Sequence, residues 1–309
     1  MKIIIGTRGS KLAVWQANWV KDEIAANHPE VSISLKIIKT TGDKILDVPL
    51  SRVGGKGLFV KEIEEALFRK EIDLAVHSMK DVPAELPEGL IIDAYTKRED
   101  PRDAFLGREK SLRMENLHPG GVVGTSSLRR QAHIKRFFPE LKTVSIRGNL
   151  DTRIRKIEEM KLDGVVLAAA GIKRMGFESK VSQYLSEEKF IPAVGQGILG
   201  IEVREADNAT REAIAALDDS DARAAVLAER GFLKTLEGGC QVPIAAYARV
   251  TEVTVSLHGM VASLDGMRVI EDTLEGERSE SEDVGRALAE TLLSRGAGKI
   301  LKDVYGSAK

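Results

Sequence analysis

Apolar and polar residues follow two different periods along the first hundred residues. Residues 31–38 alternate with a period of two, which is typical of a half-buried strand, and residues 3–5 form a shorter apolar run. Between them, Ser10 can cap a helix that carries apolar residues at helical spacing. One further helix and two strands are predicted over residues 58–71, 72–76 and 89–96. This order of strands and helices predicts an α/β layer architecture.

The same rhythm begins again after residue 101. Strands are predicted over residues 122–123, 143–146 and 164–170, with helices over residues 128–138, capped by Thr125, Ser126 or Ser127, and 149–161. A strand over residues 197–203 could return to the first block, because Pro192 and Gly195 mark another crossing of the chain. Two such blocks indicate two lobes with a cleft between them.

The pattern changes near residue 218. An Ala-rich helix is predicted over residues 221–236, a hairpin over residues 253–263 and 267–274, and a helix over residues 282–304 with a break near residues 296–298. We therefore predict three domains: an N-terminal α/β lobe of residues 1–97 and 198–216, a second, basic α/β lobe of residues 101–192, and a small α+β domain of residues 218–309. The expected fold class is α/β (α+β overall), with mixed sheets in both lobes.

Composition excludes several classes of protein. A single cysteine in 309 residues excludes an intrachain disulfide framework and a multi-cysteine metal site. No apolar run approaches the roughly 18 residues that a membrane-spanning helix needs. The first residues resemble neither a secretory nor a transit segment, so we expect a cytoplasmic protein.

The net charge of −1 is unevenly distributed. Residues 101–175 hold 16 Lys and Arg against 8 Asp and Glu, a balance of 16 − 8 = +8, so the remainder carries 30 − 39 = −9. A basic middle segment with acidic flanks indicates a local anion site rather than a protein built to bind nucleic acid.

Cys240 stands in a predicted loop, after two glycines and before Pro243. Most free cysteines are buried and inert, yet a loop can expose a thiol for chemistry. A cysteine–histidine catalytic pair needs a positioned base, and none of the five histidines has a diagnostic spacing. A thiolate that accepts a lasting covalent attachment does not need such a positioned base. Two alternatives therefore stay open for Cys240: a covalent attachment site and an inert, buried thiol.

Basic and hydroxyl side chains gather where predicted strands of the second block end. Ligands of open α/β sheets bind at that edge, helix starts attract anions, and guanidinium groups bind carboxylates and phosphates bidentately. A solvated basic face is the alternative for any single arginine. The candidates are Thr125, Ser127, Arg129, Arg130, Arg147, Arg153 and Arg174.

Similar candidates follow strands of the first block. Arg8 and Ser10 come after the first strand, while Lys80 and Asp81 come after the strand at residues 72–76. Residues 54–57 are Gly-rich but lack the spacing and the preceding strand of a phosphate-binding P-loop, so we reject that interpretation.

Nine segments, in order, resemble the porphobilinogen deaminase (hydroxymethylbilane synthase) family. Each segment alone is a weak signal, but nine in family order are highly specific. The resemblance thins after about residue 250. The segments are residues 6–13, 53–59, 77–81, 98–105, 124–130, 147–153, 170–174, 192–197 and 236–243.

The resemblance implies a three-domain, monomeric transferase whose two lobes are similar to periplasmic binding proteins. The family joins four porphobilinogen molecules into hydroxymethylbilane, releasing ammonia, on a dipyrromethane cofactor held through a thioether; no metal is implied. Carried over to this chain, Cys240 holds the cofactor and Asp81 is the catalytic carboxylate. Further cofactor contacts would be Lys80, Ser10, Thr125, Ser127, Arg129 and Arg130, and substrate contacts would be Arg8, Arg147, Arg153 and Arg174.

Two other functions remain as alternatives. The two-lobe pattern alone would also suit a non-catalytic anion-binding protein, which would bind its ligand reversibly and leave the thiol unmodified. A nucleic-acid binder would use the basic segment and depend strongly on salt, but that segment lacks clustered aromatic residues.

Overall fold

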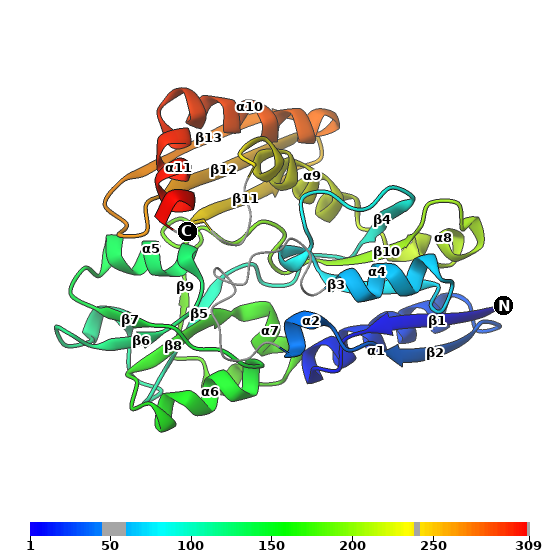
Figure 1. The fold of residues 1–309 in the computed structure, drawn as a ribbon, viewed down its shortest axis with the longest axis horizontal. Coiled ribbons are helices and arrows are strands. Elements are labelled where there is room, and N and C mark those ends of the chain that lie inside the picture. Colours follow the sequence, from blue (N-terminus) through cyan, green and yellow to red (C-terminus); the bar gives the residue numbers. More distant parts are fainter. Residues whose placement is uncertain (45–59, 238–241, 308–309) are drawn as a thin grey trace. The chain divides into compact units, whose positions relative to one another are not determined.

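The computed structural model describes residues 1–44, 60–237 and 242–307 (Figure 1). Contacts divide the chain into two compact units. Among the described residues, the first unit comprises residues 1–44, 60–99 and 197–223, and the second comprises residues 100–196, 224–237 and 242–307.

A five-stranded mixed sheet forms the centre of the first unit, in the order β2-β1-β3-β10-β4. Strand β1 runs parallel to β2 and β3, while β10 runs antiparallel to β3 and β4. The carboxyl ends of β1, β2 and β3 therefore meet at one edge of the sheet. The strands are β1 (Lys2–Thr7), β2 (Ser32–Ile37), β3 (Leu74–Ser78), β4 (Leu90–Tyr95) and β10 (Leu199–Arg204).

Helices cover both faces of this sheet. The Ser10 hydroxyl accepts the N–H of Ala13 at 3.2 Å and so begins α1, which packs with α8 on one face. Helix α4 buries Ile63 and Leu67 on the other face. The helical segments are α1 (Lys11–Asn27), α2 (Thr41–Lys44), α4 (Lys61–Phe68), η1 (Met79–Asp81), α8 (Asn208–Ile214) and η4 (Ala215–Leu217).

The second unit contains a sheet of the same kind, in the order β7-β6-β8-β5-β9. Strand β6 is parallel to β7 and β8, while β5 is antiparallel to β8 and β9. Helix α5 packs on one face, and α6 and α7 pack on the other. The elements are β5 (Asp103–Gly107), β6 (Val122–Gly124), α5 (Leu128–Phe137), β7 (Lys142–Val144), α6 (Leu150–Glu159), β8 (Gly164–Ala168), α7 (Ala169–Arg174) and β9 (Gln183–Leu185).

A three-stranded antiparallel sheet, in the order β11-β12-β13, completes the second unit (Figure 1). Apolar residues of α9, α10 and α11 fill one of its faces, and Ala132 of α5 packs on the other with Ala245 and Met260. The elements are α9 (Ser220–Thr235), β11 (Ile244–Val250), β12 (Thr254–Ala262), β13 (Val269–Glu277), α10 (Ser281–Ser294) and α11 (Ala297–Ser307). Short 3₁₀ turns are η2 (Met114–Asn116), η3 (Glu178–Lys180) and η5 (Arg278–Glu280).

The fold class expected from the sequence is confirmed: two mixed sheets with helices on their faces, and a small antiparallel sheet covered by helices. The β12–β13 hairpin and the break between α10 and α11 also match their predictions. Several boundaries differ by one or more residues, as in β3 and β7. The strand predicted over residues 164–170 ends at residue 168, because Ala169 and Ala170 begin α7. An apolar run without polar punctuation does not distinguish a buried strand from the buried start of a helix.

Candidate active site

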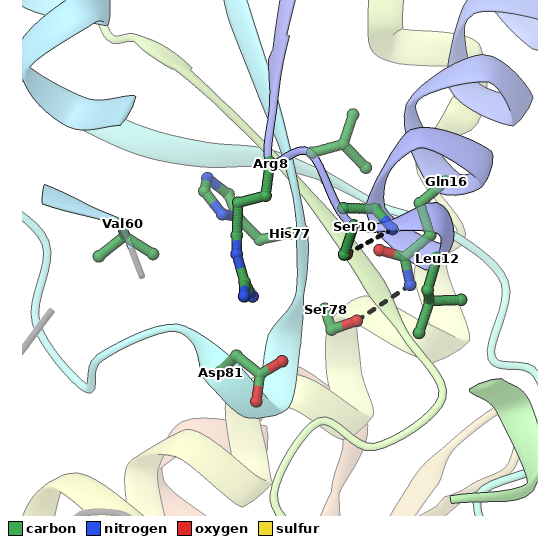
Figure 2. Close-up of a pocket in the computed structure, with 10 residues that line it drawn as sticks. Arg8, Ser10, Leu12, Gln16, Val60, His77, Ser78 and Asp81 are labelled. Carbon is green, nitrogen blue, oxygen red and sulfur yellow. Dashed lines mark hydrogen bonds between the residues drawn. The ribbon is translucent and has the colours of Figure 1, made fainter. Parts of the chain in front are cut away.

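Arg8 and Asp81 line one pocket in the first unit. Arg8 follows β1, and Asp81 ends η1 directly after β3, at the edge where these parallel strands finish. The pocket is partly open to solvent. Figure 2 shows the Arg8 guanidinium directed toward the side of the pocket where the Asp81 carboxylate lies. Its lining is Arg8, Ser10, Leu12, Ala13, Gln16, Val60, Val76, His77, Ser78 and Asp81.

The two charged groups differ in exposure. Arg8 is half-buried, whereas Asp81 is exposed to solvent. A guanidinium can bind a carboxylate through two parallel hydrogen bonds, and a carboxylate can accept the N–H of a heterocycle. The pocket thus suits a ligand that carries both carboxylates and ring N–H groups.

Three polar side chains of the pocket, those of Gln16, His77 and Ser78, were not among the site residues predicted from the sequence. The amide of Gln16 donates to the Ser78 hydroxyl at 3.1 Å across the pocket wall. The Nε2 atom of His77 lies 2.8 Å from Oε2 of Glu202, which stands behind the wall on β10. Glu202 left a signal in the sequence, since it is a charged residue within the apolar run of residues 199–203.

Several predicted residues of the second unit lie at one edge of its sheet. Strands β6, β7 and β8 are parallel, and each ends immediately or a few residues before a helix starts. Ser127 caps α5 by accepting the N–H of Arg130 at 3.4 Å, and Thr125 is buried just before it. The edge therefore presents helix N-termini, which favour anions.

Arg147, Arg153 and Arg174 are all half-buried in this unit. Arg147 follows β7 within three residues, and Arg153 in α6 donates from Nε to the carbonyl oxygen of Gly148 at 2.8 Å. Arg174 is the last residue of α7, so the whole of this helix separates it from the end of β8. Arg147 and Arg153 thus lie nearer to the helix N-termini than Arg174 does.

Arg129 and Arg130 are buried and engage Asp103, the first residue of β5. Arg129 Nη1 and Arg130 Nη2 each lie 2.8 Å from a carboxylate oxygen of Asp103. Arg129 also donates to the carbonyl oxygen of Ile191 at 2.6 Å. Burial opposes the charged form, but the two guanidinium groups outweigh it and hold the pKa of the Asp103 carboxyl far below its usual range. Much of the hydrogen-bonding capacity of both arginines is therefore used within the protein.

Of the two remaining predicted residues, Lys80 and Cys240, the structure describes only Lys80. Lys80 is half-buried in η1 beside Asp81. Cys240 lies outside the described residues. Within the described ranges, no group of three or more His, Cys, Asp or Glu side chains is arranged to hold a metal ion. A search of the same residues finds no helix with the length and apolarity needed to cross a bilayer.

Comparisons with known proteins identify a family for this chain. The family profile "Porphobilinogen deaminase, dipyromethane cofactor binding domain" matches residues 3–212, and "Porphobilinogen deaminase, C-terminal domain" matches residues 223–294. The porphobilinogen deaminase of Trichlorobacter lovleyi is 55% identical over 98% of this chain and 97% of its own. That of Geobacter metallireducens is 56% identical over 97% of this chain and 94% of its own.

Solved structures with a similar course of the chain include the methionine-binding protein MetQ. It has a TM-score of 0.44 and 15% sequence identity, over 70% of this chain and 88% of MetQ. The family matches do not favour the alternative of a non-catalytic anion-binding protein. With both family profiles in chain order and more than half of the residues identical to two named relatives, this chain belongs to the porphobilinogen deaminase family.

Proposed function

We propose that Asp81 is the catalytic carboxylate of this enzyme and that Arg8 binds a substrate carboxylate beside it. The enzyme is a transferase of tetrapyrrole biosynthesis, which joins four porphobilinogen molecules into hydroxymethylbilane and releases ammonia. The observation that carries the residue assignment is the shared pocket, in which an exposed carboxylate and a half-buried guanidinium come from the ends of adjacent parallel strands.

The residues present fit the dipyrromethane cofactor of the family. A dipyrromethane carries ring N–H groups and carboxylate arms, and the pocket offers a carboxylate acceptor and a guanidinium donor for them. When bound, the cofactor supplies the pyrrole carbon from which the product chain grows. We propose that Cys240 holds it through a thioether, with further contacts from Lys80, Ser10, Thr125, Ser127, Arg129 and Arg130.

Asp81 would act on charge and on protons. Loss of ammonia from porphobilinogen leaves positive charge on its pyrrole nitrogen, and a carboxylate within hydrogen-bond reach stabilises that charge. Each condensation also removes a proton from a pyrrole carbon, and the exposed Asp81 carboxylate can hold this proton and pass it to solvent.

Arg147, Arg153 and Arg174 are proposed to bind further carboxylates, because each added ring brings an acetate and a propionate arm. A guanidinium has five N–H bonds, so contacts within the protein do not exhaust it. Arg130 illustrates this capacity, since its buried Nε has no hydrogen-bond partner among the described residues. Arg130 can therefore remain bound to Asp103 and still have an N–H to donate.

We also propose the three-domain division at residues 1–97 with 198–216, 101–192 and 218–309, supported by the three separate sheets. A monomer in the cytoplasm that does not bind nucleic acid is proposed as well. A thiol that must stay free for its cofactor is favoured by a reducing compartment. Light scattering after gel filtration tests the monomer, and cell fractionation tests the cytoplasmic location. A salt-dependent DNA-retention assay tests the absence of nucleic-acid binding.

Intact mass and turnover together test the residue roles. We expect active protein to weigh more than its sequence by one covalent group, and Cys240→Ser to lack this mass. Asp81→Asn should keep the mass yet lose about 100-fold or more in kcat, while Asp22→Asn, an exposed aspartate on α1, should match wild type. An active protein of bare sequence mass would exclude the role of Cys240, and normal turnover of Asp81→Asn would exclude that of Asp81.

A further inference from the structure

The segment that carries Asp81 is a single short turn. Asp81 is the last residue of η1, which directly follows β3. Figure 2 shows no hydrogen bond between the Asp81 carboxylate and the other residues that line the pocket. The backbone of η1 therefore sets the position of this carboxylate, so the contacts of η1 decide where the proposed catalytic group lies.

Met79 is the buried residue of η1. Its N–H donates to the carbonyl oxygen of Ile198 at 3.0 Å, and its side chain is only 1% exposed. The N–H of Val82 donates to the carbonyl oxygen of Met79 at 3.2 Å and closes the turn. Met79 thus joins η1 to the residues that lead into β10.

Gly200 on β10 makes room for the Met79 side chain. It stands opposite His77 in the antiparallel β3–β10 ladder, and Met79 comes two residues after His77. A Cβ atom at Gly200 would meet Sδ of Met79 far inside the ordinary contact distance of about 3.5–4.0 Å, and Cγ2 of Ile92 at 3.0 Å. The backbone of Gly200 is not in the left-handed region, so these side chains alone oppose an alanine at this position.

Strand β10 is a fixed support for this contact. Residues 199–203 pair with residues 74–78 of β3 without a break, and β4 pairs with β10 on its other side. Across the β3–β10 ladder, Nε2 of His77 lies 2.8 Å from Oε2 of Glu202, and both side chains are buried. A bulkier residue at position 200 should therefore displace Met79 and leave the strand in place.

We propose that Gly200 and Met79 are positioning residues for Asp81. The missing side chain on β10 lets Met79 pack against the sheet, and Met79 fixes the turn that presents the carboxylate to the pocket. A methyl group at position 200 must displace Sδ of Met79 by roughly 1 Å or more. Because protein interiors are close-packed, this displacement passes into the backbone of η1. The inference rests on the proposed function, since it takes Asp81 as the catalytic carboxylate.

Steady-state kinetics of the Gly200→Ala holoenzyme test the proposal. A misplacement of about 1 Å can slow an enzyme on the order of 100-fold, so we expect kcat to fall about 10- to 100-fold. KM should change little, because Arg8, the proposed ligand of the substrate carboxylate, directly follows β1 and is not part of η1.

Gly259→Ala is the matched control. Gly259 is also a buried glycine within a strand, and its added Cβ on β12 would stand 2.7 Å from Cε2 of Phe232. This variant should lower the thermal midpoint without lowering kcat. An unchanged kcat in Gly200→Ala, or an equal fall in Gly259→Ala, would overturn the proposal.

A double-mutant comparison tests whether the effect passes through Met79. Met79→Ala removes Sδ, so adding Gly200→Ala to this variant should lower kcat little further. An equal effect of Gly200→Ala with and without the Met79 side chain would overturn the proposal. If Gly200→Ala fails to fold, Met79→Ala is measured alone; we expect a lower kcat at a similar KM, and an unchanged kcat would exclude the anchoring role.

A crystal structure of Gly200→Ala gives a readout that does not depend on activity. We expect Cα of Asp81 to move by roughly 1 Å relative to the sheet, while Arg8 stays in place. An unmoved Asp81 would overturn the proposal. If Asp81→Asn turns over normally, the proposed role of Asp81 fails, whereas the crystal structure still decides whether Gly200 and Met79 position η1.

Discussion

The carboxylate of Asp103 accepts hydrogen bonds from three side chains of the second unit. It is 0% exposed at the start of β5 and receives Arg129 and Arg130 from α5. Its Oδ1 also accepts from the amide of Gln196 at 2.9 Å. Asp103→Asn keeps the size of this side chain and removes its negative charge, so two guanidinium groups that are 4% and 5% exposed lose their counter-ion.

The expected cost follows from burial. Removal of one partner of a buried ion pair costs about 3–5 kcal/mol, because an uncompensated charge stays in the interior. Two cations depend on one carboxylate here, so we expect the upper part of that range. The pKa of Asp103 is depressed in the folded protein, so its stabilisation is present above the pKa of the unfolded carboxyl, about 3.9, and is lost as the pH falls below that value.

Urea unfolding at pH 7 measures this cost against a matched control. Asp303→Asn removes the same charge from the Arg268–Asp303 pair, which also spans 2.8 Å but is about half exposed. Exposed pairs contribute about 1 kcal/mol or less, so Asp103→Asn should lower the free energy of unfolding several-fold more than Asp303→Asn. Equal losses in the two variants would refute the argument that burial makes Asp103 indispensable.

Two further substitutions test the packing of the second unit. Burial lowers the pKa of His133 to about 3. The free energy of unfolding of wild type should therefore fall by about 1.4 kcal/mol for each pH unit below about 6.5. His133→Leu should lack this contribution, and equal pH slopes of the two proteins in urea unfolding would contradict the prediction. Gly285→Ala should lower the thermal midpoint, because the added Cβ on α10 would stand 2.0 Å from the carbonyl oxygen of Ala228 on α9; an unchanged midpoint would mean that the two helices separate at little cost.

Local signals in the sequence were sufficient for much of the fold. Ser10 and Ser127 begin helices by accepting backbone N–H groups, and a glycine at residue 296 separates α10 from α11. The strands that were not predicted, β5, β9 and β11, have few distinguishing residues of their own. Strand β5 pairs with β8 and β9, which are distant in sequence, and β11 pairs with its neighbour β12. Pairing is a tertiary effect that a local pattern does not contain.

The candidate site also has residues that a local sequence pattern indicates and residues that only the three-dimensional packing reveals. Arg8 and Asp81 were found because each follows a predicted strand, and the parallel pairing of β1 and β3 brings those strand ends together. Asp103 was not found, since it looks like an ordinary polar residue until its burial is known. Burial depends on how β5 packs in three dimensions, which a local sequence pattern does not contain.

The basic segment illustrates why a charge count overestimates a binding surface. Its balance of +8 over residues 101–175 predicts a local anion site. Among the described residues, at least six cations of the segment nevertheless lie within 4 Å of carboxylates. Two of the acids involved, Asp100 and Glu271, are outside the segment. The pairs are Arg102–Asp100, Arg108–Asp163, Arg129–Asp103, Arg130–Asp103, Arg136–Glu271 and Lys173–Asp100. The charge of a cation that is paired with a carboxylate is largely cancelled at longer range. The segment should therefore attract a small polycarboxylate at defined positions without becoming a general polyanion surface, because the position of each guanidinium, and not their sum, decides what it binds.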